Sequence, residues 1–290
     1  LAALIRSNWT GLGRHPRSDL AARLKTRPPC RCTGMSLAAA HPHPRDRAIT
    51  FEAGPHVYTI NGDSNYTSVT TWLHSNFEKF DADAVASRLI AKGPKPGTKY
   101  HGMTKQAIMA SWRANGREAS TAGTALHENI ERFYNGEEVD PEAKAAPDYR
   151  LFERFQGANA RLKPYRTEWM IWDAELRLAG SIDMIFANDD GTLSIYDWKR
   201  CKNIQPNSPW NKFSHTDCIS HIPDTNYWHY ALQLNVYAAL LEKNYGKTIK
   251  DLRLVVLHPD QQEPRVVTLP WLRDEVADLF AARLGSARTK

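Results

Sequence analysis

Two apolar, strand-like runs joined by a polar turn constrain this chain more than any other feature of its sequence. They form the stretch AGSIDMIFANDDGTLSIYDWK, in which Asp183, Asp197 and Lys199 follow the pattern Asp-x13-Asp-x-Lys. Side chains two residues apart on a strand share a face, so Asp197 and Lys199 are expected to project together. Carboxylates are hard oxygen ligands that suit Mg²⁺, and a nearby lysine can orient an attacking water or neutralise charge on phosphorus oxygens. The pattern therefore favours a metal-dependent site that cleaves phosphodiester bonds.

The same spacing has a plainer interpretation. Asp-x-Lys is a common sequence, and on an exposed hairpin it forms only a solvated ion pair. Here the two charged residues follow the apolar run 193–196 and flank Trp198, which indicates a strand that is at least partly buried. Because burying unpaired charge is costly, this context favours a functional interpretation. Choosing between the two interpretations depends on motifs elsewhere in the chain.

The positive charge of the chain is concentrated at its beginning. Residues 1–34 carry seven basic side chains and one acidic one, which accounts for the whole formal net charge of +6 of the 290-residue chain. The remainder is balanced, so overall basicity is no argument that the folded part binds nucleic acid. The segment is rich in Arg, Ser and Ala and precedes Met35, which fits a transit peptide that would direct the protein to mitochondria or the nucleus; translated upstream sequence is the alternative. We expect residues 1–50 to form a basic, disordered tail or targeting segment followed by a linker.

Hydropathy and cysteine usage exclude some classes of protein. No run of 18 apolar residues occurs, so we expect neither a transmembrane helix nor a membrane partner. The four cysteines match neither a disulfide framework nor a four-thiolate metal site, which favours a reducing, intracellular compartment. His215, Cys218 and His221 could bind zinc, but a fourth ligand is missing and a polar loop is the favoured interpretation.

Local patterns predict helices and strands over most of the chain. Consecutive strands joined by turns indicate an antiparallel meander, and we expect an N-terminal hairpin and helical region at 51–118 and a core domain at 119–290. The expected elements are a hairpin running into a helix at 56–73, helices at 78–92, 102–118, 121–134, 148–162, 227–246 and 270–284, and strands at 167–180, 180–186, 193–199, 252–258 and 265–269.

Four short motifs occur in a fixed order along these elements. They are Gly-Thr-x-x-His at 123–127, Gly-x-x-Asp at 180–183, Asp-x-Lys at 197–199 and Gln-x-x-x-Tyr at 233–237. This order resembles the PD-(D/E)xK nuclease superfamily, and within it the RecB-like exonuclease branch, which includes mitochondrial genome-maintenance exonucleases and viral relatives. The resemblance covers roughly residues 118–260 and is carried by four motifs together, which is far more specific than any one of them.

The resemblance implies an α/β (α+β) fold with a restriction-endonuclease-like core. That core has the element order αβββαβ, with a central mixed sheet flanked by helices, and here it would carry an N-terminal helical extension. The resemblance implies that His127, Asp183, Asp197 and the backbone carbonyl of Trp198 bind a divalent metal ion and that Lys199 activates the water. Gln233 and Tyr237 would contact the DNA backbone or support Lys199. Glu131 would orient His127 or contact other groups that bind the metal.

The implied activity is hydrolysis of DNA by a metal-dependent exonuclease acting on single-stranded or free ends. Mg²⁺ would be the cofactor, Mn²⁺ could substitute, and no iron–sulfur cluster is expected because the cysteine pattern for one is missing. Partners would be DNA and proteins of replication or recombination. Lys105, Arg113 and Arg117 are candidate DNA-binding residues, with a solvated helical surface as the alternative. A catalytically inactive DNA-binding module of the same fold and a flap or structure-specific endonuclease remain alternative functions.

Overall fold

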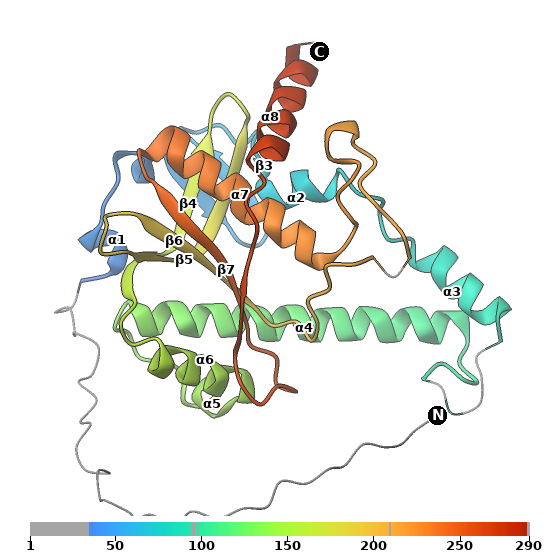
Figure 1. Ribbon diagram of the computed structural model, residues 1–290. Coiled ribbons are helices and arrows are strands. Elements are labelled where there is room, and N and C mark those ends of the chain that lie inside the picture. The colour runs from blue at the N-terminus through green and yellow to red at the C-terminus, as the bar shows by residue number, and fades with distance from the viewer. Residues whose placement is uncertain (1–34, 94–96, 98, 209, 289–290) are drawn as a thin grey trace, which may run out of the picture. The chain divides into compact units, whose positions relative to one another are not determined.

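The computed structural model of this chain describes residues 35–93, 97, 99–208 and 210–288 (Figure 1). The basic segment 1–34 and its expected role as a targeting signal therefore lie outside the described residues. In the described part of the chain, no helix combines the length and apolar character needed to cross a membrane.

Among the described residues, runs of strands and runs of helices follow one another along the chain, and the strands form one six-stranded and one two-stranded sheet. The elements are α1 Leu37–Ala40, η1 Pro44–Ala48, β1 Ile49–Glu52, β2 Val57–Ile60, β3 Thr67–Ser68, α2 Val69–His74, α3 Ala82–Ala91, α4 Lys105–Tyr134, α5 Pro141–Ala145, α6 Pro147–Ala158, β4 Lys163–Asp173, β5 Leu178–Ala187, β6 Leu193–Lys199, η2 Asp217–Ile219, α7 Asn226–Tyr245, β7 Ile249–Val256, β8 Arg265–Thr268 and α8 Arg273–Arg288.

The larger sheet is mixed, as the resemblance implied. Strands β4, β5 and β6 form the expected antiparallel meander, β7 pairs parallel to β6, and β8 pairs antiparallel to β7. Strand β3 pairs parallel to the first two residues of β5. Since β4 pairs with β5 along its length, β3 and β6 share the other edge of β5, one at each end of that strand.

Helices cover both faces of this sheet, and each face has its own hydrophobic core (Figure 1). On one face, side chains of α2, α7 and α8 pack against alternate residues of the strands. On the other face, α4 and α6 pack against Met184, Phe186, Tyr196 and Trp198. Because both faces are buried, β6 has six buried residues in succession instead of the alternation of a half-exposed strand.

One long helix replaces two that we expected to be separate. Helix α4 runs without interruption through Gly116 and Gly123, and the expected domain boundary between residues 118 and 119 falls in its interior. Each glycine costs a helix about 1 kcal/mol relative to alanine. Tertiary contacts hold the two ends: Lys105 pairs with Asp83 of α3, and the C-terminal half packs against α6 and the sheet.

Two further expectations near the N-terminus differ from the structure. Residues 35–48, which we expected to be a linker, form α1 and η1, and Ser36 and His43 cap these helices. Strand β2 forms its hairpin with the preceding strand β1 instead of with residues that follow it. The positive φ angles of Asn61 and Gly62 turn the chain after β2 toward β3, which joins the larger sheet.

Candidate active site

The candidate site lies where strands β5 and β6 separate. Their antiparallel register ends at the pair Met184–Tyr196, and the next residues along the two strands are Asp183 and Asp197. Strand β6 stays paired with β7 through Lys199, so its other edge has backbone groups available to the site. The backbone N–H of Trp198 uses this freedom and donates to Asp183 Oδ2 over 2.9 Å.

His127 reaches the same opening from α4. Its Nε2 lies 2.9 Å from the backbone carbonyl oxygen of Trp198. A carbonyl only accepts hydrogen bonds, so Nε2 carries a proton and donates it to this carbonyl. The other ring nitrogen, Nδ1, faces Asp183, whose Oδ2 is 3.4 Å away. Metal-binding histidines usually fix their tautomer in this way, with the second ring nitrogen donating to a backbone carbonyl.

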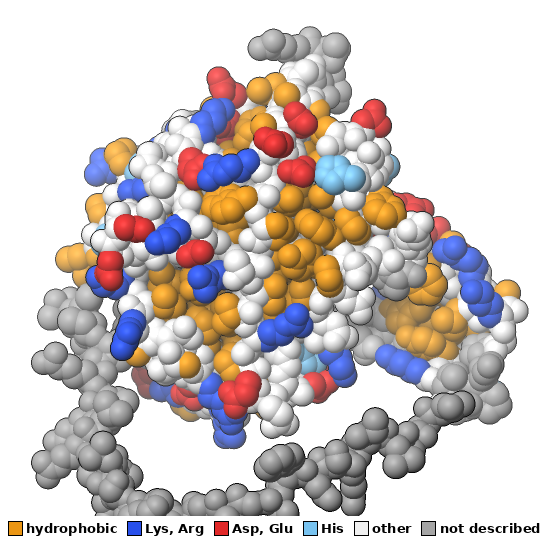
Figure 2. Space-filling view, in the orientation of Figure 1, with side chains coloured by type: hydrophobic (Ala, Val, Ile, Leu, Met, Phe, Trp, Pro, Cys, Tyr) orange, Lys and Arg blue, Asp and Glu red, His pale blue; other side chains and the backbone are white. Residues whose placement is uncertain are grey.

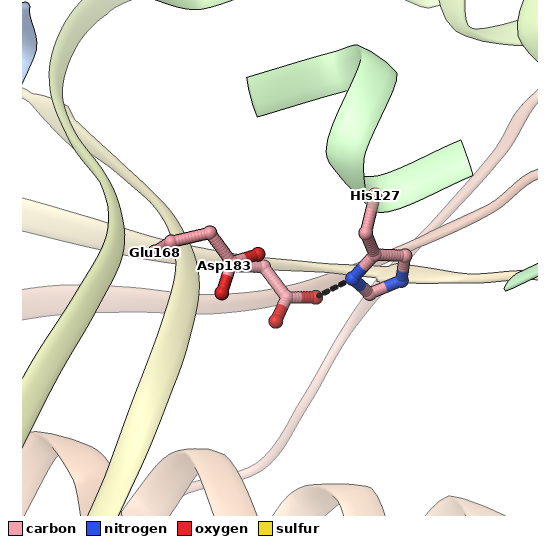
Figure 3. A group of neighbouring side chains, drawn as sticks. All are labelled: His127, Glu168 and Asp183. Atoms are coloured by element: carbon pink, nitrogen blue, oxygen red, sulfur yellow. Dashed lines mark ion pairs between the residues drawn. The ribbon is translucent and has the colours of Figure 1, made fainter. Parts of the chain in front are cut away.

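Glu168 on β4 completes the site, and we did not predict it from the sequence. It lies between the paired residues Thr167–Met184 and Trp169–Ile182 and so faces Asp183 across the strands. Figure 3 shows the carboxylates of Glu168 and Asp183 and the ring of His127. One donor atom from each of these three residues lies within 4.8 Å of the other two. The available signal was an acidic residue directly before the apolar run 169–172, where charge is costly.

Burial and neighbouring charge change the acidity of these carboxyl groups. Burial, followed by the Asp183 carboxylate, raises the pKa of Glu168 from its ordinary 4.5 to about 8, although the hydroxyl of Ser181, which donates to Glu168 over 2.9 Å, opposes this. A proton held at neutral pH allows two carboxyl groups to lie side by side without a cation. It also means that a bound cation would displace that proton.

Asp197 and Lys199 form a buried ion pair beside this group. The distance from Asp197 Oδ2 to Lys199 Nζ is 2.5 Å. Burial raises the pKa of Asp197, although the positive charge of Lys199 acts in the opposite direction. Burial by itself would lower the pKa of Lys199, but the Asp197 and Asp183 carboxylates raise it. The lysine is therefore a permanent ammonium group. Asp197 lies next to the three grouped donors but outside that group, so its role as a metal ligand stays a prediction.

Helix α7 supports the lysine with aromatic side chains. The ring of Tyr230, which we did not predict, lies 4.7 Å from Lys199 Nζ in a cation–π contact. Gln233 donates to the hydroxyl of Tyr237 over 3.3 Å. Tyr237 is buried and packs so closely on Gly180 that a β-carbon at that position would lie 2.7 Å from its ring. The glycine of one motif and the tyrosine of another thus form one contact between β5 and α7.

The other predicted residues lie farther from the three donors. Glu131 is one turn beyond His127 on α4 and lines a cavity of about 630 Å³ that Glu168 also lines. Burial, followed by the nearby Glu137, raises the pKa of Glu131. Lys105 is engaged with Asp83 of α3 over 2.7 Å. Arg113 and Arg117 are exposed on the middle of α4. None of these placements tests their predicted roles.

The three grouped donors fit a divalent cation by their chemistry. One imidazole nitrogen and two carboxylates are a donor set for a divalent metal ion, and three protein ligands leave positions for water and a phosphate oxygen. The carbonyl of Trp198 was expected to be a further ligand, but in this structure it accepts the hydrogen bond from His127. A mixed sheet with acidic donors and a lysine at the divergence of two strands defines a class of metal-dependent phosphodiester hydrolase.

Comparison with known proteins specifies that class. The family model of the PD-(D/E)XK nuclease superfamily matches residues 101–286. The chain belongs to this superfamily, whose members are nucleases that use divalent metal ions. The match begins just before α4 and ends within α8, so it includes every site residue described above. No curated protein matches the chain.

Solved structures resemble the chain only distantly. A candidate exonuclease from Eubacterium rectale is 9% identical, with 78% of this chain and 79% of that chain covered and a TM-score of 0.36. The protein SSO0001 is 12% identical, with 78% of this chain and 77% of that chain covered and a TM-score of 0.32.

Proposed function

We propose that this nuclease is a Mg²⁺-dependent exonuclease of the RecB-like branch that degrades DNA from single-stranded ends. The observation that carries the proposal is the group of donors from His127, Glu168 and Asp183 beside the buried ammonium of Lys199. Each comes from a different element or strand, and the contacts described above leave each with a defined orientation. A binding module without catalysis would have no need of a lysine held in this way.

The side chains suggest a division of labour in the reaction. His127, Glu168 and Asp183 would hold a divalent cation, which would supply Lewis-acid chemistry toward the scissile phosphate and a bound water. Lys199 holds the attacking water and offsets negative charge that develops on the phosphorus oxygens. Asp197 and Tyr230 keep the ammonium group in place, since one pairs with it and the other lies against it.

The projecting part of the molecule supports a single-stranded substrate. Helix α3 and the beginning of α4 extend past the sheet (Figure 1), and Figure 2 shows hydrophobic and basic side chains side by side there. The ring of Phe80 is 71% exposed and lies 5.9 Å from that of Trp112. Exposed aromatic rings among basic side chains are typical of surfaces on which unpaired bases stack. We propose that a single strand reaches the site along this part, with Arg113 and Arg117 contacting its phosphates.

Replacing the lysine tests the catalytic assignment. We expect Lys199→Ala to lower the rate of cleavage by at least about 100-fold, since it removes an electrostatic contribution of that size, while DNA affinity stays within about threefold. Lys202→Ala is the matched control, because Lys202 is exposed and pairs only with Asp260 on the surface. Cleavage is measured on labelled single strands and binding by fluorescence anisotropy. Unreduced turnover by Lys199→Ala would contradict the role of the lysine.

The mode of attack is tested with modified ends. The substrates are single-stranded, double-stranded and flapped DNA labelled internally, with their 5′ ends, 3′ ends or both either free or blocked. An exonuclease degrades single strands with free ends and spares circular or doubly blocked ones. Cleavage of blocked flaps at the junction would favour a structure-specific endonuclease, and binding without cleavage under Mg²⁺ or Mn²⁺ would favour an inactive DNA-binding module.

A further inference from the structure

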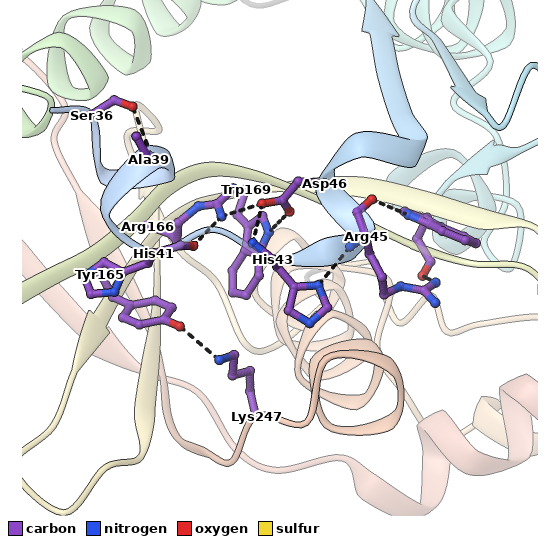
Figure 4. A network of polar contacts seen from close by, with 11 residues as sticks. Ser36, Ala39, His41, His43, Arg45, Asp46, Tyr165, Arg166, Trp169 and Lys247 are labelled. Atoms are coloured by element: carbon purple, nitrogen blue, oxygen red, sulfur yellow. Dashed lines mark hydrogen bonds and ion pairs between the residues drawn. The ribbon is translucent and has the colours of Figure 1, made fainter.

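The segment that precedes the first strand lies directly against the strand that carries Glu168. Figure 4 shows α1 and η1 crossing β4, with polar side chains of both bonded to one another. The segment is fixed at several points. Arg45 donates to the backbone carbonyl of Trp172 over 2.7 Å and its guanidinium lies 3.6 Å from the centre of the Trp172 ring, and the backbone N–H of Leu37 donates to the Asn135 side chain at the end of α4.

One carboxylate of this segment contacts β4 on both sides of Glu168. Asp46 Oδ2 accepts from the guanidinium of Arg166 over 2.9 Å, and Asp46 Oδ1 accepts from the indole N–H of Trp169 over 2.9 Å. The backbone N–H of His43 also donates to Oδ2. Arg166 is 5% exposed and Trp169 1% exposed, so Asp46 is the charged partner of a buried cation and the acceptor for a buried indole.

The backbone at Glu168 needs such support. Its φ angle is +44°, in the left-handed region that a glutamate within a strand rarely adopts. Strained backbone of this kind persists only where surrounding contacts hold it. Pairing with β5 holds Thr167 and Trp169. The contacts of Asp46 hold Arg166, two residues before Glu168, and Trp169, the residue after it. Without this conformation the carboxylate of Glu168 would not meet His127 and Asp183 in the present way.

We propose that Asp46 is a positioning residue of the metal centre: it fixes Arg166 and Trp169 so that Glu168 keeps its place beside His127 and Asp183. The inference rests on the proposed function, because it takes these three residues as metal ligands. Asp46 is not one of the three grouped donors. Its effect is transmitted through β4, and the other contacts of the segment would keep α1 and η1 in place when its carboxylate is removed.

Metal affinity separates positioning from general stabilisation. Free Mn²⁺ is measured by electron paramagnetic resonance in titrations of the full chain at 4 °C, and thermal unfolding is recorded in EDTA. We expect Asp46→Ala to weaken Mn²⁺ binding by about tenfold or more, the usual effect of losing a residue that orients ligands. Asp46→Asn keeps an acceptor for the indole and should give a smaller loss. Asp63→Ala is the control, because Asp63 pairs on the surface with Arg177, which lies in the turn before β5.

The outcomes distinguish this inference from the function on which it rests. Equal Mn²⁺ affinity of Asp46→Ala and the parent chain would overturn the positioning role, even if the melting temperature falls. Absence of Mn²⁺ binding by the parent chain would overturn the metal centre and the inference together. If Asp46→Ala does not fold, Asp46→Asn and Trp169→Phe decide, since Trp169→Phe removes the indole donor and leaves the pair of Asp46 and Arg166 in place. Unchanged affinity in both variants would overturn the proposal.

Discussion

At the scale of single residues, the raised pKa of Glu168 determines the charge of the site. Burial and the Asp183 carboxylate raise the pKa of Glu168 to about 8, so the folded protein without metal keeps this proton at neutral pH. An unfolded glutamate releases it near its ordinary value of 4.5. Folding is therefore linked to proton uptake, and metal binding to proton release.

The pH dependence of stability tests this charge state. The contribution of the raised pKa to stability is fully present below about pH 4.5 and is lost as the pH rises toward 8. In EDTA, we expect the melting temperature of the parent chain to fall relative to Glu168→Gln by roughly 5 °C between pH 5 and pH 8. Calorimetry of both proteins over this range gives the difference. A difference that stays constant with pH would show that Glu168 titrates normally.

Residues of the site differ in how far the sequence could predict them. The spacing of Asp183, Asp197 and Lys199 places them on neighbouring strands, so the sequence predicts them. His127 is predicted because its motif precedes the strand motifs in the order that the resemblance implies. Glu168 has no such spacing: its place depends on a left-handed backbone conformation and on pairing with β5. Tyr230 depends on the angle at which α7 crosses the sheet. Such contacts arise from tertiary packing, which local patterns do not encode.

At the scale of elements, the contact between Gly180 and Tyr237 joins a strand to the helix that covers it. A β-carbon at residue 180 would lie 2.7 Å from the Tyr237 ring and 3.0 Å from its hydroxyl oxygen. Glycine therefore lets α7 approach β5 closely, and that distance sets where Gln233 lies relative to the site. Two motifs that are far apart in the sequence are the two sides of one contact.

Adding a methyl group at this contact tests its importance. We expect Gly180→Ala to destabilise the protein by about 1–3 kcal/mol, as overpacking does in well-packed cores, and to lower activity because α7 has to move. The control is Gly157→Ala, whose added β-carbon in α6 meets no atom within 4 Å; it should be neutral or slightly stabilising. Urea unfolding compares the two variants. Equal stability of Gly180→Ala and the parent chain would show that α7 adapts without cost.

The middle of α4 offers a second test at this scale. If Arg113 and Arg117 contact phosphates, the Arg113→Ala/Arg117→Ala variant should bind single-stranded DNA about tenfold more weakly and show a smaller dependence of affinity on salt concentration. Arg154→Ala is the control, because it removes a positive charge from α6, where Arg154 pairs with Glu263. Anisotropy titrations at several salt concentrations measure both effects. Equal loss in Arg154→Ala would indicate nonspecific electrostatics.

At the scale of the whole molecule, the sequence predicted the core more accurately than its surroundings. The antiparallel meander and helix α7 with its end at Gly246 follow from hydrophobic patterns and turn residues, the mixed sheet follows from the family resemblance, and all are present. The continuity of α4 does not follow from such patterns, because its two glycines look like a break. The packing of residues 35–48 against β4 depends on single polar contacts such as Arg166–Asp46.

The requirement for metal at the three donors tests the central claim most directly. Single-turnover degradation of a single strand with free ends is measured in Mg²⁺ and in EDTA, for the parent chain and for Asp183→Asn, which keeps the shape of the side chain and can still accept from Trp198. We expect the parent chain to cleave only with Mg²⁺, and Asp183→Asn to lose at least about 100-fold in rate while remaining folded. Cleavage by the parent chain in EDTA, or undiminished cleavage by Asp183→Asn, would contradict a metal-dependent nuclease centred on His127, Glu168 and Asp183.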